Sequence, residues 1–230
     1  MVTFPQPLTQ PQPTTEPRAT RLRARSWAGA WAAQGFRLRL GLAVLLLLGL
    51  VPVVPHFYHF VQSRPGQQLA DPLLALLPVR DVSDLTFALI YGSAVVTLAF
   101  LLRRPQLLLR ALWAYYFLQI LRMFTLWLIP LDPPTDLVVL RDPVMDRFME
   151  VTTQPIVRDL FFSGHTATTA LLGLVVRGCR LRWALALMTL AVGTLVLVQR
   201  VHYSCDVLAA PFFAWLAYWA AKRVTKINPR

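Results

Sequence analysis

The sequence predicts an all-α, polytopic membrane protein with six transmembrane helices and with both termini in the cytoplasm. Hydrophobic residues make up 56% of its 230 residues and charged residues only 15%, which excludes a disordered or fibrous protein. Six apolar stretches approach the roughly 20 residues that cross the hydrocarbon core of a bilayer as a helix. The formal net charge of +12 arises mainly from segments that alternate along the chain between these stretches. Apolar composition and segregated basic charge together indicate a multi-pass membrane protein.

The six predicted helices differ in length and in the residues at their ends. Aromatic residues at the ends of the first, third and sixth are typical of helices anchored at a membrane interface. The shorter ones can span by tilting or by local thinning of the bilayer. Their ranges are 38–57, 85–102, 107–129, 160–176, 183–198 and 207–221.

Basic residues beside the helices predict the orientation. With a cytoplasmic N-terminus, 16 of the 23 Lys and Arg residues fall in inner segments and 10 of the 11 Asp and Glu residues in outer ones. This distribution follows the positive-inside rule. The basic surplus is therefore a topology signal, and we expect no nucleic-acid partner. The excess of Arg over Lys favours a bacterial plasma membrane.

Two domains are predicted, a tail at 1–35 and a six-helix membrane domain at 36–225. The tail begins with a Pro-rich stretch that is typical of disorder. Arg residues then alternate with Trp27, Trp31 and Phe36. This pattern fits a basic cytoplasmic flank, or alternatively a helix lying on an anionic leaflet.

Two of the four histidines lie in polar motifs near the predicted outer face. His165 follows Ser163 and Gly164 in the motif at 159–166, and His202 begins the motif at 202–206. Their separation of 37 positions corresponds to one inward and one outward helix, which returns His202 to the face of His165. Asp206 follows His202 by one helical turn, so its carboxylate can fix the imidazole tautomer.

Helix polarity favours an anion beside these histidines. The fourth and sixth helices both begin at the outer face, where their unpaired amides attract negative charge. A phosphate could bind the amides around Ser163, with Gly164 allowing close approach. Arg122, Arg158 or Arg200 could supply positive charge, although pairing with Asp159 or Asp132 explains Arg122 equally well. Ser163 also suits a helix N-cap, and Asp206 suits the first turn of a helix.

Three segments resemble the motifs of a known family. The stretch from Asp159 to Thr166 (DLFFSGHT) and that from His202 to Val207 (HYSCDV) resemble the catalytic motifs of the sphingomyelin synthase-like branch of the type 2 phosphatidic acid phosphatase superfamily. Arg122 with Thr125 and Pro130, followed by Pro133, resembles that branch's motif at the end of its third helix. Leu195 and Val196 replace a Ser-Arg pair of the wider superfamily, which favours the phosphotransferase branch.

This resemblance implies a membrane lipid phosphotransferase that works through a phosphohistidine on His202, with His165 as acid and base and Asp206 as the third catalytic residue. The donor would be a membrane phospholipid and the acceptor a lipid alcohol, on the exoplasmic side, with no cofactor and no metal. Water as acceptor would make the protein a lipid phosphatase instead. The implied substrate-binding residues are Ser163, Gly164, Arg122, Asp159, Arg158, Arg200 and Tyr203.

Other functional classes are open from the residues alone. His165 and His202 on one face could ligate haem or a metal. A catalytically silent scaffold would retain the fold without turnover. His56 and His59 fit an interfacial aromatic belt better than a metal site.

Overall fold

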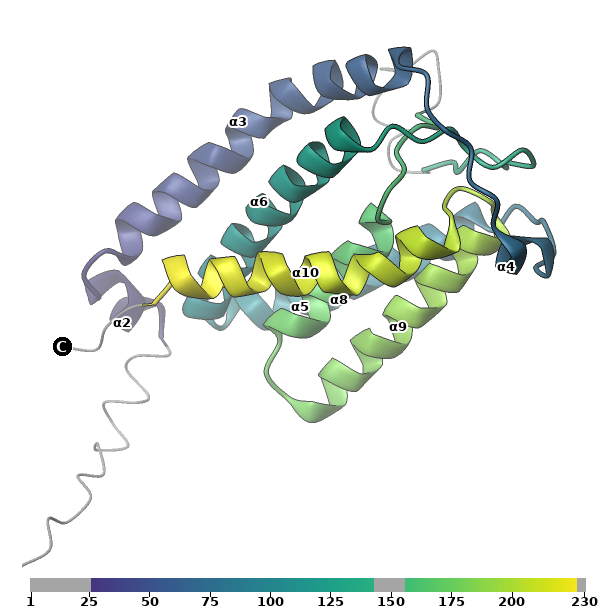
Figure 1. Ribbon diagram of the computed structural model, residues 1–230. Coiled ribbons are helices and arrows are strands. Elements are labelled where there is room, and N and C mark those ends of the chain that lie inside the picture. The colour runs from purple at the N-terminus through teal and green to yellow at the C-terminus, as the bar shows by residue number, and fades with distance from the viewer. Residues whose placement is uncertain (1–25, 143–155, 227–230) are drawn as a thin grey trace, which may run out of the picture.

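The computed structural model describes residues 26–142 and 156–226 (Figure 1). Most of the predicted tail, residues 1–25, lies outside the described residues. Within the described ranges the chain forms helices and no strand. The helices are α2 (Trp27–Ala32), α3 (Phe36–Ser63), α4 (Pro72–Ala75), α5 (Ser83–Leu102), α6 (Pro105–Leu128), α8 (Gly164–Val175), α9 (Cys179–Val198) and α10 (Ser204–Val224).

Five of these helices, α3, α5, α6, α9 and α10, are long and apolar enough to cross a membrane. Their mean hydropathy over the most apolar 18 residues lies between 1.2 and 2.3, and at most a third of each such window is buried inside the protein. Apolar helices whose surface is mostly exposed to the surroundings are expected where lipid is the solvent. The chain is therefore a multi-pass membrane protein with an all-helical fold.

The remaining predicted membrane helix is shorter than expected. The sequence predicts a helix at 160–176, but α8 has 12 residues, which extend about 18 Å, against about 30 Å of hydrocarbon. The predicted start at Leu160 is wrong because Phe161 and Phe162 have left-handed backbones, with φ of 72° and 46°. Ser163 then caps the helix, its Oγ accepting a hydrogen bond from Thr166 N at 3.3 Å.

The core is formed mainly by α6, α8 and α10. Four alanines on one face of α10 are fully buried, and such small residues let helix backbones approach closely in a membrane. They pack in one cluster with large side chains of α6, such as Leu109 and Leu118. Figure 1 shows α3 at the edge of the bundle, beside α6. The alanines are Ala210, Ala214, Ala217 and Ala221.

A short helix precedes the bundle in the segment that the sequence assigns to the tail. Ser26 caps α2 by accepting a hydrogen bond from Gly29 N at 3.1 Å. The indole nitrogen of Trp27 donates to Leu102 O at 2.7 Å, which ties α2 to the end of α5. Trp27 and Trp31 both pack edge-on against Phe36. This part of the basic flank therefore packs against the membrane helices.

The first residues of α8 and α10 lie side by side at one end of the bundle. Ser163 N donates to Asp206 O at 3.0 Å, joining the two helix starts directly. Asp71, which begins α4, accepts a hydrogen bond from Ser204 N at 2.6 Å and so covers the start of α10. Both predicted histidine motifs are therefore brought to the same end of the bundle.

Candidate functional site

His202 and Asp206 form a buried pair at the start of α10. His202 Nδ1 lies 3.3 Å from Asp206 Oδ2. The same oxygen accepts a hydrogen bond from Tyr203 N at 3.1 Å, which caps the helix and fixes the carboxylate. A carboxylate at Nδ1 favours the tautomer that carries its proton there and leaves the Nε2 lone pair free. His202 is thus suited to act as a nucleophile or base.

His165 stands across from His202 in the first turn of α8. The centroids of the two imidazole rings are 6.5 Å apart. Phe87 of α5 packs edge-on against His165, with ring centroids 5.7 Å apart. His165 Nδ1 is buried and has no hydrogen-bond partner. A buried polar atom without a partner is costly, and functional sites are where such atoms are expected.

Both histidines line a pocket that opens at one end of the bundle. Its volume is about 390 Å³ when the open mouth is included. Asp159 is the third polar residue in its wall. The other lining residues are apolar, namely Leu137, Val139, Leu140, Ile156, Val157 and Val201. A few convergent polar groups in an apolar wall suit an amphiphilic ligand.

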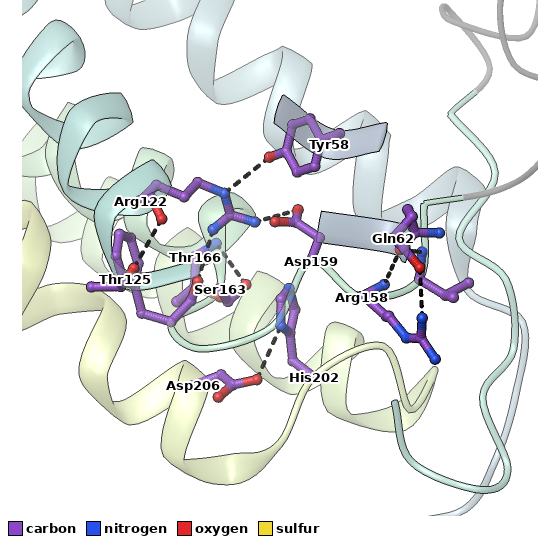
Figure 2. Close-up of polar contacts among 12 residues, drawn as sticks. Tyr58, Gln62, Arg122, Thr125, Arg158, Asp159, Ser163, Thr166, His202 and Asp206 are labelled. Atoms are coloured by element: carbon purple, nitrogen blue, oxygen red, sulfur yellow. Dashed lines mark hydrogen bonds and ion pairs between the residues drawn. The ribbon is translucent and has the colours of Figure 1, made fainter. Parts of the chain in front are cut away.

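Arg122 lies behind the start of α8 and is almost completely buried (Figure 2). Its Nη2 forms an ion pair with Asp159, its Nη1 donates to Phe162 O at 2.7 Å, and its Nε donates to the Tyr58 hydroxyl at 3.3 Å. A Cβ added to Gly164 would lie 2.5 Å from Arg122 Cζ. The guanidinium thus packs against the first turn of α8, where glycine is needed for its close approach.

Asp159 connects Arg122 with the pocket. Figure 2 shows its carboxylate beside the guanidinium, and Asp159 lines the pocket together with His202. Burial alone would raise its pKa, but the nearby positive charge of Arg122 outweighs burial and lowers the pKa below its ordinary value. The carboxylate is therefore charged at neutral pH and compensates Arg122. Of the two explanations that the sequence leaves open for Arg122, pairing with Asp159 is found in this structure.

Ser163 and Tyr203 are bonded within the protein. Ser163 is fully buried and accepts hydrogen bonds from the amide and the hydroxyl of Thr166. The Tyr203 hydroxyl donates to Asp132 O at 2.9 Å and accepts from Leu69 N at 3.2 Å. Neither side chain lines the histidine pocket. Both residues hold the helix starts and their covering loops in place.

Arg158 and Arg200 are bonded to the loops around the site. Arg158 Nε forms an ion pair with Asp132 Oδ1 at 2.7 Å. Arg200 has a left-handed backbone, with φ of 59°, and its Nη2 donates to Leu77 O at 3.2 Å. Neither arginine lines the histidine pocket. Arg122 does not line the pocket either, but it forms an ion pair with Asp159, which does.

Sequence reasoning missed the side chains that α3 and α5 add around the site. Tyr58 contacts Arg122, and the Gln62 side chain accepts hydrogen bonds from the amides of Val157 and Arg158. Tyr58 and Gln62 are four residues apart and so share one face of α3. The spacing of these two polar side chains could have indicated a polar face of α3 that points toward the site. The aromatic residues around Tyr58 instead suggested only an interfacial aromatic belt.

The comparisons with known proteins identify the segment that contains both histidines. Residues 158–223 match the family model described as PAP2 superfamily C-terminal. The match covers 66 of the 230 residues, including His165, His202 and Asp206. It supports the type 2 phosphatidic acid phosphatase superfamily, and with it a lipid phosphatase or phosphotransferase type of activity. No curated protein and no solved structure matches the chain.

Proposed function

We propose that the protein is an integral membrane lipid phosphotransferase that moves a phosphoryl head group from a phospholipid to a lipid alcohol. The observation that carries the proposal is the placement of His165 and of the Asp206-oriented His202 in the wall of one pocket. The apolar remainder of that wall suits the glycerol and acyl portions of a lipid. The match at 158–223 supports the same class of chemistry.

In the first half of the reaction, His202 Nε2 attacks the phosphorus of the donor lipid and forms an N–P bond. The bond between phosphorus and the diacylglycerol oxygen breaks, and its electron pair leaves on that oxygen. His165 donates a proton to the departing oxygen. The phosphoryl head group remains on His202 as a phosphohistidine.

In the second half, the acceptor hydroxyl transfers its proton to His165 and its oxygen attacks the phosphorus. The N–P bond breaks and its electron pair returns to Nε2. Arg122 and the positive end of the α8 helix dipole would stabilise the extra negative charge on the phosphorane. During this step Arg122 would have to interact with the phosphoryl group while it remains paired with Asp159.

The positive-inside distribution supports an active site on the exoplasmic side of the membrane, with both termini in the cytoplasm. Hydrolysis is the alternative within the same chemistry, with water in place of the lipid alcohol. The apolar pocket wall supports transfer, because it favours an apolar acceptor over water. The same small pocket opposes a haem ligated by His165 and His202, because a porphyrin needs more room than about 390 Å³.

The test uses the purified full-length protein in proteoliposomes with a phospholipid labelled at phosphorus, in the presence of both ceramide and diacylglycerol. We expect label in a new lipid, and label on the protein after an alkaline quench that preserves phosphohistidine. The variant His202→Ala should lose both signals, whereas the matched variant His59→Ala should retain them. Label released only as a soluble product would leave the phosphatase alternative, and full turnover by His202→Ala would refute the nucleophile.

A further inference from the structure

A second and larger pocket lies at the opposite end of α8 from the histidines. Its volume is about 1240 Å³ including its open mouth. Its wall contains the last turn of α8, the connection to α9, the first turns of α9 and one residue of α10. The residues that matter here are Arg177, Arg182, Leu174, Trp183, Ala186 and Tyr218.

This pocket follows from the shortness of α8. The helix packs between α9 and α10, which scarcely contact each other, so they are held apart by α8 itself. After 12 residues α8 ends at Val175, and Val176 continues in an extended conformation. Gly178, with φ of 138°, then turns the chain into α9. Beyond the end of α8, the space between α9 and α10 is left without a helix to fill it.

The pocket has both apolar and charged lining residues, and all of its charged residues are positive. Arg177 and Arg182 are both exposed, and no Asp or Glu is found among the described residues that line the pocket. Leu174, Ala186 and Tyr218 supply apolar surface deeper along the helices. Trp183, which is 72% exposed, lines the same pocket. Exposed Trp beside Arg is typical of the level of lipid head groups.

We infer that this pocket binds one anionic glycerophospholipid of the leaflet opposite the histidine site. Its phosphate lies between Arg177 and Arg182, and one acyl chain fills the space between α9 and α10 below the end of α8. Two guanidinium groups suit a phosphate by bidentate, charge-assisted hydrogen bonds. The apolar wall and the large volume select a lipid over a free phosphate. The lipid completes the packing that a full-length helix would otherwise provide.

The site is separate from the proposed chemistry, because the histidines lie in the first turns of α8 and α10 and this pocket lies beyond the last turn of α8. The bound lipid is accordingly a stabilising ligand and no substrate. This inference therefore does not depend on the proposed function.

The test measures retained lipid on the detergent-purified full-length protein by native mass spectrometry. The protein is incubated with phosphatidylglycerol, or with phosphatidylcholine of the same acyl chains. We expect one phosphatidylglycerol to be retained in preference to phosphatidylcholine. The double variant Arg177→Ala/Arg182→Ala should reduce this retention by about tenfold or more, because each basic residue contributes measurably to binding an anionic head group. The control Arg37→Ala/Arg223→Ala removes two positive charges outside the pocket and should retain the lipid.

A further variant distinguishes a lipid bound in the pocket from a lipid held only by general electrostatic attraction to the protein surface. Ala186→Trp keeps both arginines and fills the apolar space, so it should also lose the lipid. Glycerol phosphate, which has no acyl chain, should not compete. Equal retention by the Arg177→Ala/Arg182→Ala variant and the control would overturn the inference, as would undiminished retention by Ala186→Trp or effective competition by glycerol phosphate.

Discussion

The carboxylate of Asp206 joins the first turn of α10 to the ring of His202. Its Oδ2 lies 3.3 Å from His202 Nδ1 and 3.1 Å from Tyr203 N. The backbone contact fixes the carboxylate, and the carboxylate in turn fixes the imidazole. Both side chains are almost fully buried. The orientation of the proposed nucleophile is therefore set by the same interaction that begins the helix.

The variant Asp206→Asn should keep the fold and lose most of the turnover. An amide oxygen in place of Oδ2 can still cap Tyr203 and face Nδ1, but it has no negative charge to stabilise the positively charged His202 ring that forms during the reaction. The expected loss in kcat is about 100-fold to 10,000-fold, by analogy with other carboxylate-oriented histidines. Label transfer in proteoliposomes and thermal unfolding measure the two effects. Asp84→Asn, in the first turn of α5, is the matched control, and comparable activity of the two variants would contradict the assignment.

Much of this site is readable from the sequence because it depends on short spacings. His202 and Asp206 are one helical turn apart, and the apolar stretch between the histidine motifs returns the chain to the same end of the bundle. By contrast, the start of α8 is hidden. The apolar run includes Leu160, Phe161 and Phe162. Its residue types do not indicate that Phe161 and Phe162 have left-handed backbones, which prevent the helix from beginning before Gly164. The turn depends on distant contacts, since Phe162 stacks on Phe213 and its carbonyl accepts from Arg122.

The partner of Arg122 is also beyond local sequence reasoning. The sequence shows that a buried arginine needs an anion, but Asp159, Asp132 and a bound phosphate all qualify. Only the packing of α3 against α6, which brings Tyr58 to the guanidinium, and the turn at Phe162 select Asp159. Arg158 then pairs with Asp132. Which carboxylate pairs with which arginine therefore depends on the tertiary packing of loops against helices, and the local sequence does not determine it.

Gly164→Ala should destabilise the protein and reduce turnover. The added Cβ would lie 2.5 Å from Arg122 Cζ, so the guanidinium must move away from the start of α8. Such overpacking costs about 1 to 3 kcal/mol. Gly173→Ala in the same helix is the control, because its Cβ would meet only Leu185 Cβ at an ordinary 3.5 Å. Thermal unfolding should show a lower midpoint for Gly164→Ala alone, and equal midpoints would argue against the close packing of Arg122.

Arg122→Met should be more damaging than the double variant Arg122→Met/Asp159→Asn. The single change leaves the Asp159 carboxylate without its partner, at a cost of about 3 kcal/mol. We take the lower end of the range for buried pairs because the Asp159 side chain is 24% exposed. Neutralising Asp159 as well should recover part of the loss in the midpoint of unfolding. Strict additivity of the two single changes would contradict a direct pair.

Gln199→Leu should loosen the loop that covers the histidine pocket. Gln199 is fully buried, and its side-chain amide donates to Ser83 Oγ at 2.7 Å and to Val139 O at 3.2 Å. Leucine would remove both donated hydrogen bonds and would also leave Val82 N, which donates to Gln199 Oε1 at 3.3 Å, without this acceptor, at a cost of about 1 to 3 kcal/mol. Hydrogen exchange should increase around Val139, which lines the pocket. Thr194→Leu, at an exposed position of α9, is the control. Unchanged exchange in Gln199→Leu would refute the role of the amide.

Stability at acidic pH should depend on Asp159. Its folded-state pKa lies below the ordinary value of 3.8, since Arg122 outweighs the opposing effect of burial. The ion pair therefore contributes its full stabilisation above the unfolded-state pKa and loses it as the pH falls through the folded-state pKa. The difference in unfolding midpoint between the wild type and Asp159→Asn should be constant near neutral pH and should shrink below about pH 4. Asp84→Asn controls for the removal of an exposed carboxylate at the same end of the bundle. If the difference between wild type and Asp159→Asn grew on acidification, the carboxylate would be held protonated in the folded state, and its pairing with Arg122 would not be the source of the stabilisation.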